Sequence, residues 1–341
     1  MRTKIASLLG VFLALLSAPL ALHAQQRANF KGKDIRIIVG TAPGGGYDSY
    51  ARLVATHLPK HLLGGPNIIV QNMPGAGSLT LLNYLANVAP KDGTVLGAVH
   101  SISATYPLFI PDRVRFDARS LAWIGSTLRE HHLGIASRTS GVKNFQDVIE
   151  RELIIAGAGG ATISFPVFSN EILGTKFKIV RGYEGSRPAM LALERGEVNG
   201  FVGISWSTLK TTSPALMKDG SLQIFVQFGL TKHPELPHVP WVFDCATPDN
   251  RASLDLMFST QEFGRPYVAP PGLAPSVVSA IRQAFSQMMT DHDFITDAAK
   301  RKLDLDFTSG EEIQKLIERI YQASPKDIAR VRQIVGDQIP Q

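Results

Sequence analysis

A short strand-forming run, broken by glycines and followed by a helical pattern, constrains the fold of this chain more than any other feature. Four β-branched residues, Ile35, Ile37, Ile38 and Val39, form a short strand-like run. The segment 43–46 interrupts it, and apolar residues then recur at helical spacing over 51–62. Such a turn after a parallel strand leaves backbone N–H groups unpaired at a helix amino end, where the peptide dipoles favour negative charge. The segment predicts either an anion pocket or a sharp bend that only glycine permits.

The same unit recurs along the next part of the chain. A short strand over 68–70 leads into the glycine turn 72–78, and a helix over 79–86 follows, with Ser78 as its amino cap. The run 95–99 predicts a third strand, and Ser101 follows it among small hydroxyl residues. Ligands bind at the carboxyl ends of strands in open α/β sheets, so these turns are candidate site elements.

The pattern starts afresh after residue 140, which predicts a second lobe built on the plan of the first. Strands are expected over 153–156, 177–180, 198–202 and 222–229, and a third glycine loop spans 157–164. A further strand near 267–268 and several helices complete the chain, and we expect the last helices to pack on the first lobe. The predicted divisions are a signal segment over 1–24, a first lobe over 25–130, a second lobe over 131–228, and a return to the first lobe over 229–341.

The first 24 residues have the layout of a secretory signal. Arg2 and Lys4 precede an apolar core over 5–16, Pro19 breaks it, and Ala24 supplies a small residue for cleavage. The core is too short to span a bilayer, which takes about 20 apolar residues. The sequence therefore predicts export to the periplasm, with cleavage near Ala24.

Composition argues against several classes of function. The formal net charge is +6, but the basic residues are scattered, so we expect no nucleic-acid partner. Cys245 is the single cysteine, which excludes an internal disulfide and a thiolate zinc site. Histidines are dispersed, no P-loop motif occurs, and Thr162 stands where a dinucleotide fingerprint needs its last small residue. We expect no metal and no cofactor.

Several side chains near the turns have more than one interpretation. Asp48 is expected to cap the first helix or to hold a water or an ammonium group, with Arg52 pairing to it at i,i+4. Ser205 follows a strand as a hydroxyl donor, because its surroundings lack the last glycine of a nucleophile elbow. Four further side chains are expected to be either structural or in contact with a ligand: Phe165, Arg181, Arg187 and Trp206.

Motifs in a fixed order carry a resemblance to one family over the whole mature chain. The chain resembles the periplasmic substrate-binding proteins of tripartite tricarboxylate transporters, the Bug family. The matching motifs are Ile37 to Val39 with Pro43 to Gly46, Asp48 and Ala51-Arg52; Asn72 to Gly77; Pro90 to Gly93; Tyr183 with Gly185; Leu236 to Pro240; and Ala269 to Gly272.

The resemblance implies a two-lobed α/β periplasmic-binding-protein fold of type II, the Venus flytrap, with a ligand cleft between the lobes. In such proteins backbone groups and ordered waters at the first-lobe turns hold a carboxylate, and second-lobe loops set selectivity. Carried over by position, the resemblance implicates these residues in binding: Gly45, Gly46, Tyr47, Ser101, Gly160, Ala161, Thr162, Tyr183, Gly185 and Ser205. Departures at Tyr47, at Glu184 to Ser186 and at Trp206 point to a larger or aromatic carboxylate.

The resulting expectation is a non-catalytic, monomeric receptor that captures a small organic carboxylate and delivers it to membrane transporter subunits. A receptor that signals to a membrane partner is an alternative that the sequence leaves open. A secreted hydrolase with Ser205 as nucleophile and His100 as base is the third hypothesis.

Overall fold

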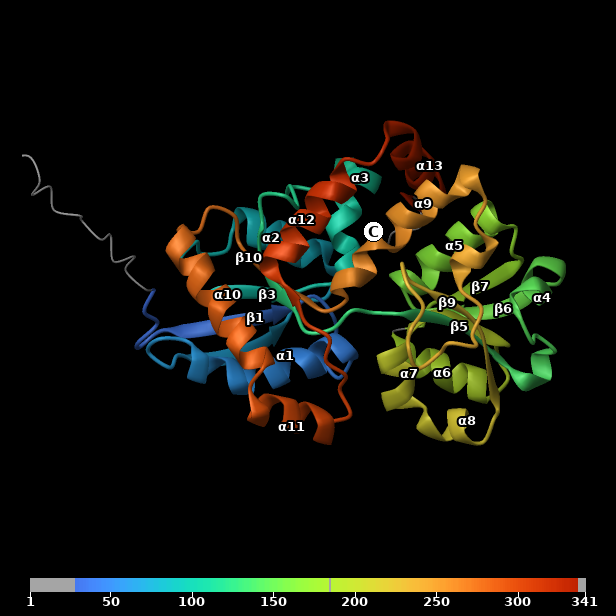
Figure 1. The fold of residues 1–341 in the computed structure, drawn as a ribbon, viewed down its shortest axis with the longest axis horizontal. Coiled ribbons are helices and arrows are strands. Elements are labelled where there is room, and N and C mark those ends of the chain that lie inside the picture. The colour runs from blue at the N-terminus through green and yellow to red at the C-terminus, as the bar shows by residue number, and fades with distance from the viewer. Residues whose placement is uncertain (1–27, 184, 337–341) are drawn as a thin grey trace, which may run out of the picture.

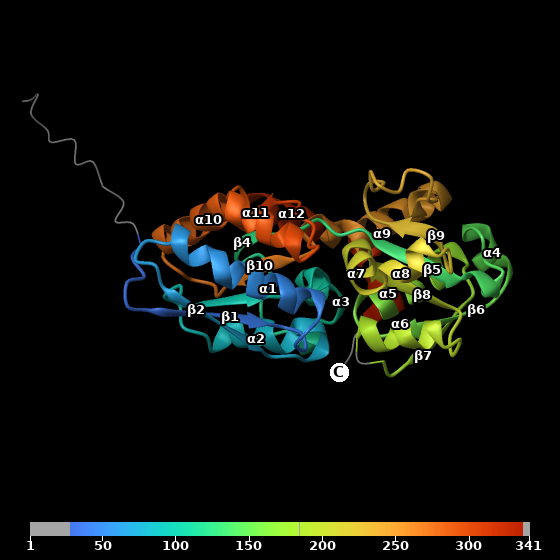
Figure 2. The same cartoon turned by 90° about the horizontal axis from the view of Figure 1, so that it is seen from below.

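The structure is a computed structural model that describes residues 28–183 and 185–336. It consists of two α/β lobes side by side, each built around one β-sheet (Figure 1; Figure 2). The predicted signal segment, residues 1–24, lies outside the described residues. Of the helices described, none combines the length and the apolar character needed to cross a bilayer.

The sheet of the first lobe combines strands from both ends of the chain. Its strands, in order across the sheet, are β11 (Thr308–Ser309), β4 (Ala122–Ser126), β10 (Pro266–Ala269), β3 (Val95–Ala98), β1 (Asp34–Val39) and β2 (Asn67–Asn72). β1 runs parallel to both β2 and β3, whereas β10 runs antiparallel to β3 and β4. The predicted strands at 35–39, 68–70 and 95–99 are therefore confirmed, and β10 confirms the strand near 267–268.

Helices cover both faces of this sheet because successive β1 side chains point to opposite sides. Ile37 packs into a core with α1 (Gly46–His57), α10 (Pro275–Met289) and α11 (His292–Lys300). Ile38 packs on the other side, into a core that includes α2 (Leu79–Asn87) and α12 (Gly310–Tyr321). The glycine turn before α1 lies at the carboxyl end of the largely buried β1, and the turn before α2 lies at the carboxyl end of the edge strand β2.

The second lobe repeats the layered plan with a sheet of different topology. Its strands, in order, are β7 (Phe177–Arg181), β6 (Leu153–Gly157), β8 (Gly200–Ser205), β5 (His132–Ser137) and β9 (Leu222–Phe228). β6 is parallel to β7 and β8, and β5 is antiparallel to β8 and β9. Its helices are α4 (Phe145–Glu150), α5 (Ala161–Leu173), α6 (Ser186–Glu194), α7 (Trp206–Thr212) and α8 (Pro214–Lys218).

The chain passes between the lobes twice. Residues 127–131 link β4 to β5, and the return runs through α9 (Pro248–Phe258) and the 3₁₀ helix η7 (Ser259–Phe263). At the end of α9, the Phe258 ring centre lies 4.9 Å from that of Phe165 and 5.5 Å from that of Phe228, both in the second lobe. These contacts favour a return to the first lobe at η7 rather than after residue 228, where the sequence analysis placed it.

The last helix, α13 (Pro325–Val335), touches both lobes. It packs against α3 (Tyr106–Phe109) of the first lobe and against α5 of the second, and it lies beside α9 (Figure 1). Arg332 Nε donates to the Leu108 carbonyl at 2.9 Å, and Arg330 Nη1 donates to the Asp249 carbonyl at 3.0 Å. The expected packing of the terminal helices on the first lobe is confirmed for α12, which packs on β4, and holds only in part for α13, which also packs on the second lobe.

Candidate functional site

A buried carboxylate holds the first glycine turn in shape. Asp48 is 3% exposed, and its Oδ2 accepts hydrogen bonds from the Gly44 backbone N–H and from Arg52 Nε, each at 2.9 Å. Its Oδ1 accepts from Arg52 Nη2 and from Asn72 Nδ2, each at 3.0 Å. Burial alone would raise the pKa of Asp48, but the bonds from Arg52, Gly44 and Asn72 hold it below its ordinary value. The predicted Asp48–Arg52 pair is confirmed, and Asp48 ties the first two glycine turns together.

The first-lobe turn meets the second lobe through His100. The Tyr47 ring centre lies 4.4 Å from that of His100, and the Tyr47 hydroxyl donates to the Gly264 carbonyl at 2.9 Å. Buried Ser101 follows His100 directly, at the start of the 3₁₀ helix η3 (Ser101–Thr105). A Cβ built on Gly160 would lie 3.9 Å from Nδ1 and Cε1 of His100. The second-lobe glycine loop therefore faces His100, whose ring packs on Tyr47 at the first-lobe turn.

A buried arginine lies directly beside this contact. Arg265 is 5% exposed, and its Cζ lies 4.3 Å from the centre of the Tyr47 ring and 5.4 Å from that of Tyr50. A Cβ built on Gly46 would lie 2.9 Å from Arg265 Nη2. Gly46 therefore lacks a side chain where the guanidinium packs against the turn.

Glu130 balances the charge of this arginine. Its Oε1 lies 2.9 Å from Arg265 Nη2 and accepts a hydrogen bond from Ser207 Oγ at 3.0 Å. The same Nη2 has longer contacts of 3.4 Å with the hydroxyls of Ser205, Ser207 and Thr208 at the start of α7. We call Tyr47, His100, Glu130, Gly160, Ser205 and Arg265 the boundary cluster, because they come from both lobes and from the chain between them.

The histidine of the boundary cluster is neutral at physiological pH. Burial, together with the nearby charges of Arg265 and His132, lowers the pKa of His100 to about 3. Arg265 stays protonated because an arginine cannot be deprotonated in a protein at ordinary pH. The charges of the boundary cluster are therefore the positive charge of Arg265 and the negative charge of Glu130, which form an ion pair.

The side chains of the second-lobe loop serve the loop itself. Thr162 Oγ1 accepts from the Ala158 N–H at 2.7 Å and donates to the Gly159 carbonyl at 2.8 Å. Ala161 opens α5, and its carbonyl oxygen would lie 2.4 Å from a Cβ built on Gly203. Ala161 and Thr162 thus shape the loop that carries Gly160 to the boundary.

Two of the predicted site residues lie apart from this cluster. Tyr183 packs against the second-lobe core that contains α6, and Gly185 precedes α6 with a φ of +114°. Among residues 28–183 and 185–336, no ring contact or hydrogen bond joins Tyr183 or Gly185 to Tyr47 or His100. Gly45 precedes α1 beside the cluster.

Ser205 lies at the cluster, and its hydroxyl is hydrogen-bonded within the start of α7. Its Oγ donates to Thr208 Oγ1 at 2.7 Å, accepts from the Thr208 N–H at 3.3 Å, and contacts Arg265. Within the described part of the chain, Ser205 forms no hydrogen bond with His100, so the pair that the hydrolase hypothesis requires is not made.

Sequence reasoning missed Arg265 and Glu130, the two charged members of the cluster. For Trp206 the two interpretations were packing and stacking on a ligand: the structure packs its half-buried ring against the second-lobe core, and stacking on a ligand stays a prediction. Trp206 Nε1 donates to Glu235 at 2.8 Å, and Trp206, Glu130 and Ser207 line a cavity of about 300 Å³ beside the crossing segment.

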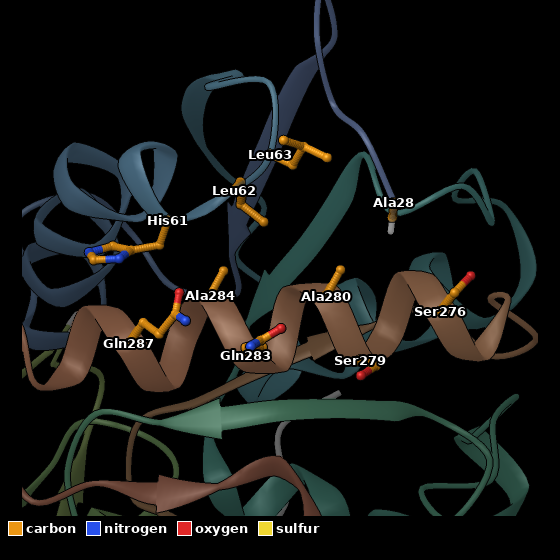
Figure 3. A pocket seen from close by; sticks show the side chains of 10 residues that line it. All are labelled: Ala28, His61, Leu62, Leu63, Ser276, Ser279, Ala280, Gln283, Ala284 and Gln287. Atoms are coloured by element: carbon orange, nitrogen blue, oxygen red, sulfur yellow. The ribbon is translucent and has the colours of Figure 1, made fainter. Parts of the chain in front are cut away.

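Another cavity lies within the first lobe, away from these residues. It measures about 230 Å³ and opens between α10 and the 3₁₀ helix η1 (Leu58–His61) with the residues after it (Figure 3). Ser276, Ser279, Gln283 and Gln287 line it from α10, and His61 lines it from η1. None of its lining residues belongs to the boundary cluster, and all come from one lobe.

Known proteins resemble this chain in sequence and in fold. The family model described as "Tripartite tricarboxylate transporter family receptor" (TctC) matches residues 50–332. The UPF0065 protein in the gbd 5' region of Cupriavidus necator is 26% identical over 82% of this chain and 82% of its own length.

Solved structures extend the comparison to the fold. The periplasmic binding protein BugD covers 90% of this chain and 98% of its own, with a TM-score of 0.64 and 19% identity. MatC from Rhodopseudomonas palustris with bound malate covers 89% of this chain and 98% of its own, with the same TM-score and identity. The predicted two-lobed periplasmic-binding-protein fold is thereby confirmed. Since the family model spans most of the sequence, this chain belongs to the TctC family of tripartite tricarboxylate transporter receptors.

Proposed function

We propose that this protein is a periplasmic receptor that captures a small organic carboxylate between its lobes and delivers it to the membrane subunits of a tripartite tricarboxylate-type transporter. It acts as a non-catalytic monomer after removal of residues 1–24. One observation supports this proposal beyond family membership: Gly160 of the second lobe faces His100 of the first, and the His100 ring packs on that of Tyr47. The malate bound to MatC supports a carboxylate as the class of ligand.

The proposed contacts are the predicted residues that reach this boundary. In this proposal backbone groups at Gly45, Gly46 and Gly160 contact the carboxylate, with the side chains of Tyr47, Ser101 and Ser205 around it. Gly160 has no side chain and the nearest atoms to an added Cβ lie 3.9 Å away, so a ligand can approach the backbone closely there. Tyr183 and Gly185 remain predicted contacts for the distal part of a larger ligand.

A ligand that contacts both lobes would favour a closed form of the protein, in which the lobes approach each other. Binding shifts an equilibrium between open and closed forms only by the difference in its affinity for the two forms. A carboxylate that touches the first-lobe turn and the Gly160 loop together gains its full contacts only when the lobes approach. Hinge closure around the ligand is therefore the proposed binding step.

A thermal melt of the mature protein against mono-, di- and aromatic carboxylates tests the proposed ligand class. At about 100 times its dissociation constant, a ligand stabilises the folded state by about 2.7 kcal/mol. For a protein of this size we expect a rise of several degrees in the melting temperature. Stabilisation by amines or sugars, with none by any carboxylate, would overturn the proposal.

A further inference from the structure

We propose that Arg265 receives the carboxylate of the ligand, an inference that rests on the function proposed above. The guanidinium lies inside the molecule, where the two lobes and the crossing segment meet. The ligand's carboxylate would share it with Glu130, the carboxylate that the chain itself supplies. Binding would then depend on a dedicated cation and not on backbone N–H groups alone.

The hydrogen bonding of Arg265 is incomplete. Nη2 lies near four acceptors: Glu130 Oε1 at 2.9 Å and three hydroxyls at 3.4 Å. Nε is buried and has no acceptor among the residues that the structure describes. A buried N–H without a partner is costly, and buried arginines usually satisfy their donors with carboxylates in paired geometry. An incoming carboxylate would give Nε the acceptor it lacks.

The position of Arg265 links this interaction to both lobes. Its guanidinium packs on Tyr47 and against Gly46 in the first lobe, and it contacts Ser205 and Thr208 in the second. A carboxylate seated on this guanidinium would therefore lie at the lobe boundary. This is the location that closure on a ligand requires.

The charges of the boundary cluster predict how neutralising Glu130 should change the affinity for a carboxylate. With neutral His100, the cluster holds the cation of Arg265 and the anion of Glu130. Glu130 occupies part of the guanidinium and repels a second anion nearby. If the ligand shares Arg265, neutralising Glu130 should strengthen carboxylate binding, because the ligand becomes the only counter-ion of a buried cation. A purely structural ion pair predicts the opposite, since its loss would loosen the site.

Calorimetric titration of the full mature chain provides the test. The probes are the carboxylate that stabilises the wild type best in the melt screen and its uncharged carboxamide. The variants are Glu130→Gln, the double variant Arg265→Gln/Glu130→Gln, and Arg282→Gln as control. The double variant avoids leaving Glu130 as an uncompensated buried charge. Arg282 is also largely buried, and it forms an ion pair with Glu311 at 3.1 Å. It lies in the first lobe, where its Nε donates to the carbonyl of Trp123 in β4.

The expected result is a change in charge discrimination as well as in affinity. Glu130→Gln should bind the carboxylate about tenfold more tightly than the wild type. The double variant should bind it about 100-fold more weakly, and its preference for the carboxylate over the carboxamide should fall to within about threefold. Arg282→Gln should match the wild type in both respects.

Two outcomes would overturn the inference while leaving the proposed function intact. One is a folded double variant that keeps the wild-type preference for the carboxylate. The other is a Glu130→Gln variant that binds the carboxylate as the wild type does or more weakly, and this readout remains if the double variant does not fold. A wild-type protein that binds sugars or amines but no carboxylate would instead overturn the proposed function, and the inference with it.

Discussion

The Gly160→Asp substitution tests whether the second-lobe loop faces the ligand. Gly160 has a φ of +55° and a ψ of −133°, a conformation in which any L side chain is strained by about 1–3 kcal/mol. The nearest atoms to an added Cβ belong to His100 at 3.9 Å, so the side chain itself has room. We therefore expect the variant to fold with reduced stability and to lose carboxylate binding.

The size of the loss follows from charge repulsion. Two carboxylates roughly 5 Å apart, at an effective dielectric constant of 20, repel each other by about 3 kcal/mol. That energy corresponds to a dissociation constant raised by roughly 200-fold. Titration calorimetry of the variant with the best carboxylate from the melt screen measures this change directly.

Gly160→Asn is the matched control, because it has the same shape and the same backbone strain without the charge. Both variants should lower the melting temperature of the free protein by similar amounts, and only the aspartate should raise the dissociation constant by the full factor. Equal affinities in the wild type, the aspartate variant and the asparagine variant would show that Gly160 does not border the ligand.

Three other predictions concern the scaffold around the site. Asp48→Asn should lower the free energy of unfolding, measured in urea titrations at pH 7, by about 1–3 kcal/mol. The pKa of Asp48 in the folded protein lies below the ordinary carboxyl value of 3.8. The difference between wild type and variant should therefore persist above pH 3.8 and vanish as the pH falls through the folded pKa. Gly203→Ala should cost more than about 2 kcal/mol in the same assay, since φ is +84° and the new Cβ would lie 2.4 Å from the Ala161 carbonyl oxygen. Val331→Ala, at a fully buried position of α13, should cost about 1–3 kcal/mol, and a loss within 0.5 kcal/mol would contradict the packing of α13 described above.

Local patterns in the sequence predicted the strands, the glycine turns and most helices. The β-branched run at Ile35 to Val39 and the breaks after it act over a few residues, so they are legible without the fold. The same holds for the capping box between Ser309 and Glu312 at the start of α12, which the structure contains. Ser78 marks the limit of this logic: it precedes α2, but its hydroxyl bonds to the Gly40 carbonyl and the His100 N–H rather than capping the helix.

The charged pair of the boundary cluster could not be predicted in this way. The residues around Glu130 and around Arg265 do not mark the two as partners, and only the crossing of the chain between the lobes places them 2.9 Å apart. The place of α13 was missed for a similar reason, because its amphipathic pattern says that one face is covered but not by what. Pairings between distant parts of a chain depend on the whole topology, which local propensity does not contain.

The helix that straddles both lobes has a consequence for measurements of opening. If α13 stays with one lobe as the other rotates, its contact with α3 or with α5 must slide or separate. α13 would then act as a third connection between the lobes, beside the two crossing segments, and limit how far the lobes can open. A fluorescent reporter fused after residue 341 would therefore be attached close to this connection and could alter the lobe opening that it is meant to measure. Fluorophores on α11 and α8, at the outer surfaces of the two lobes, would track opening while leaving α13 free (Figure 1).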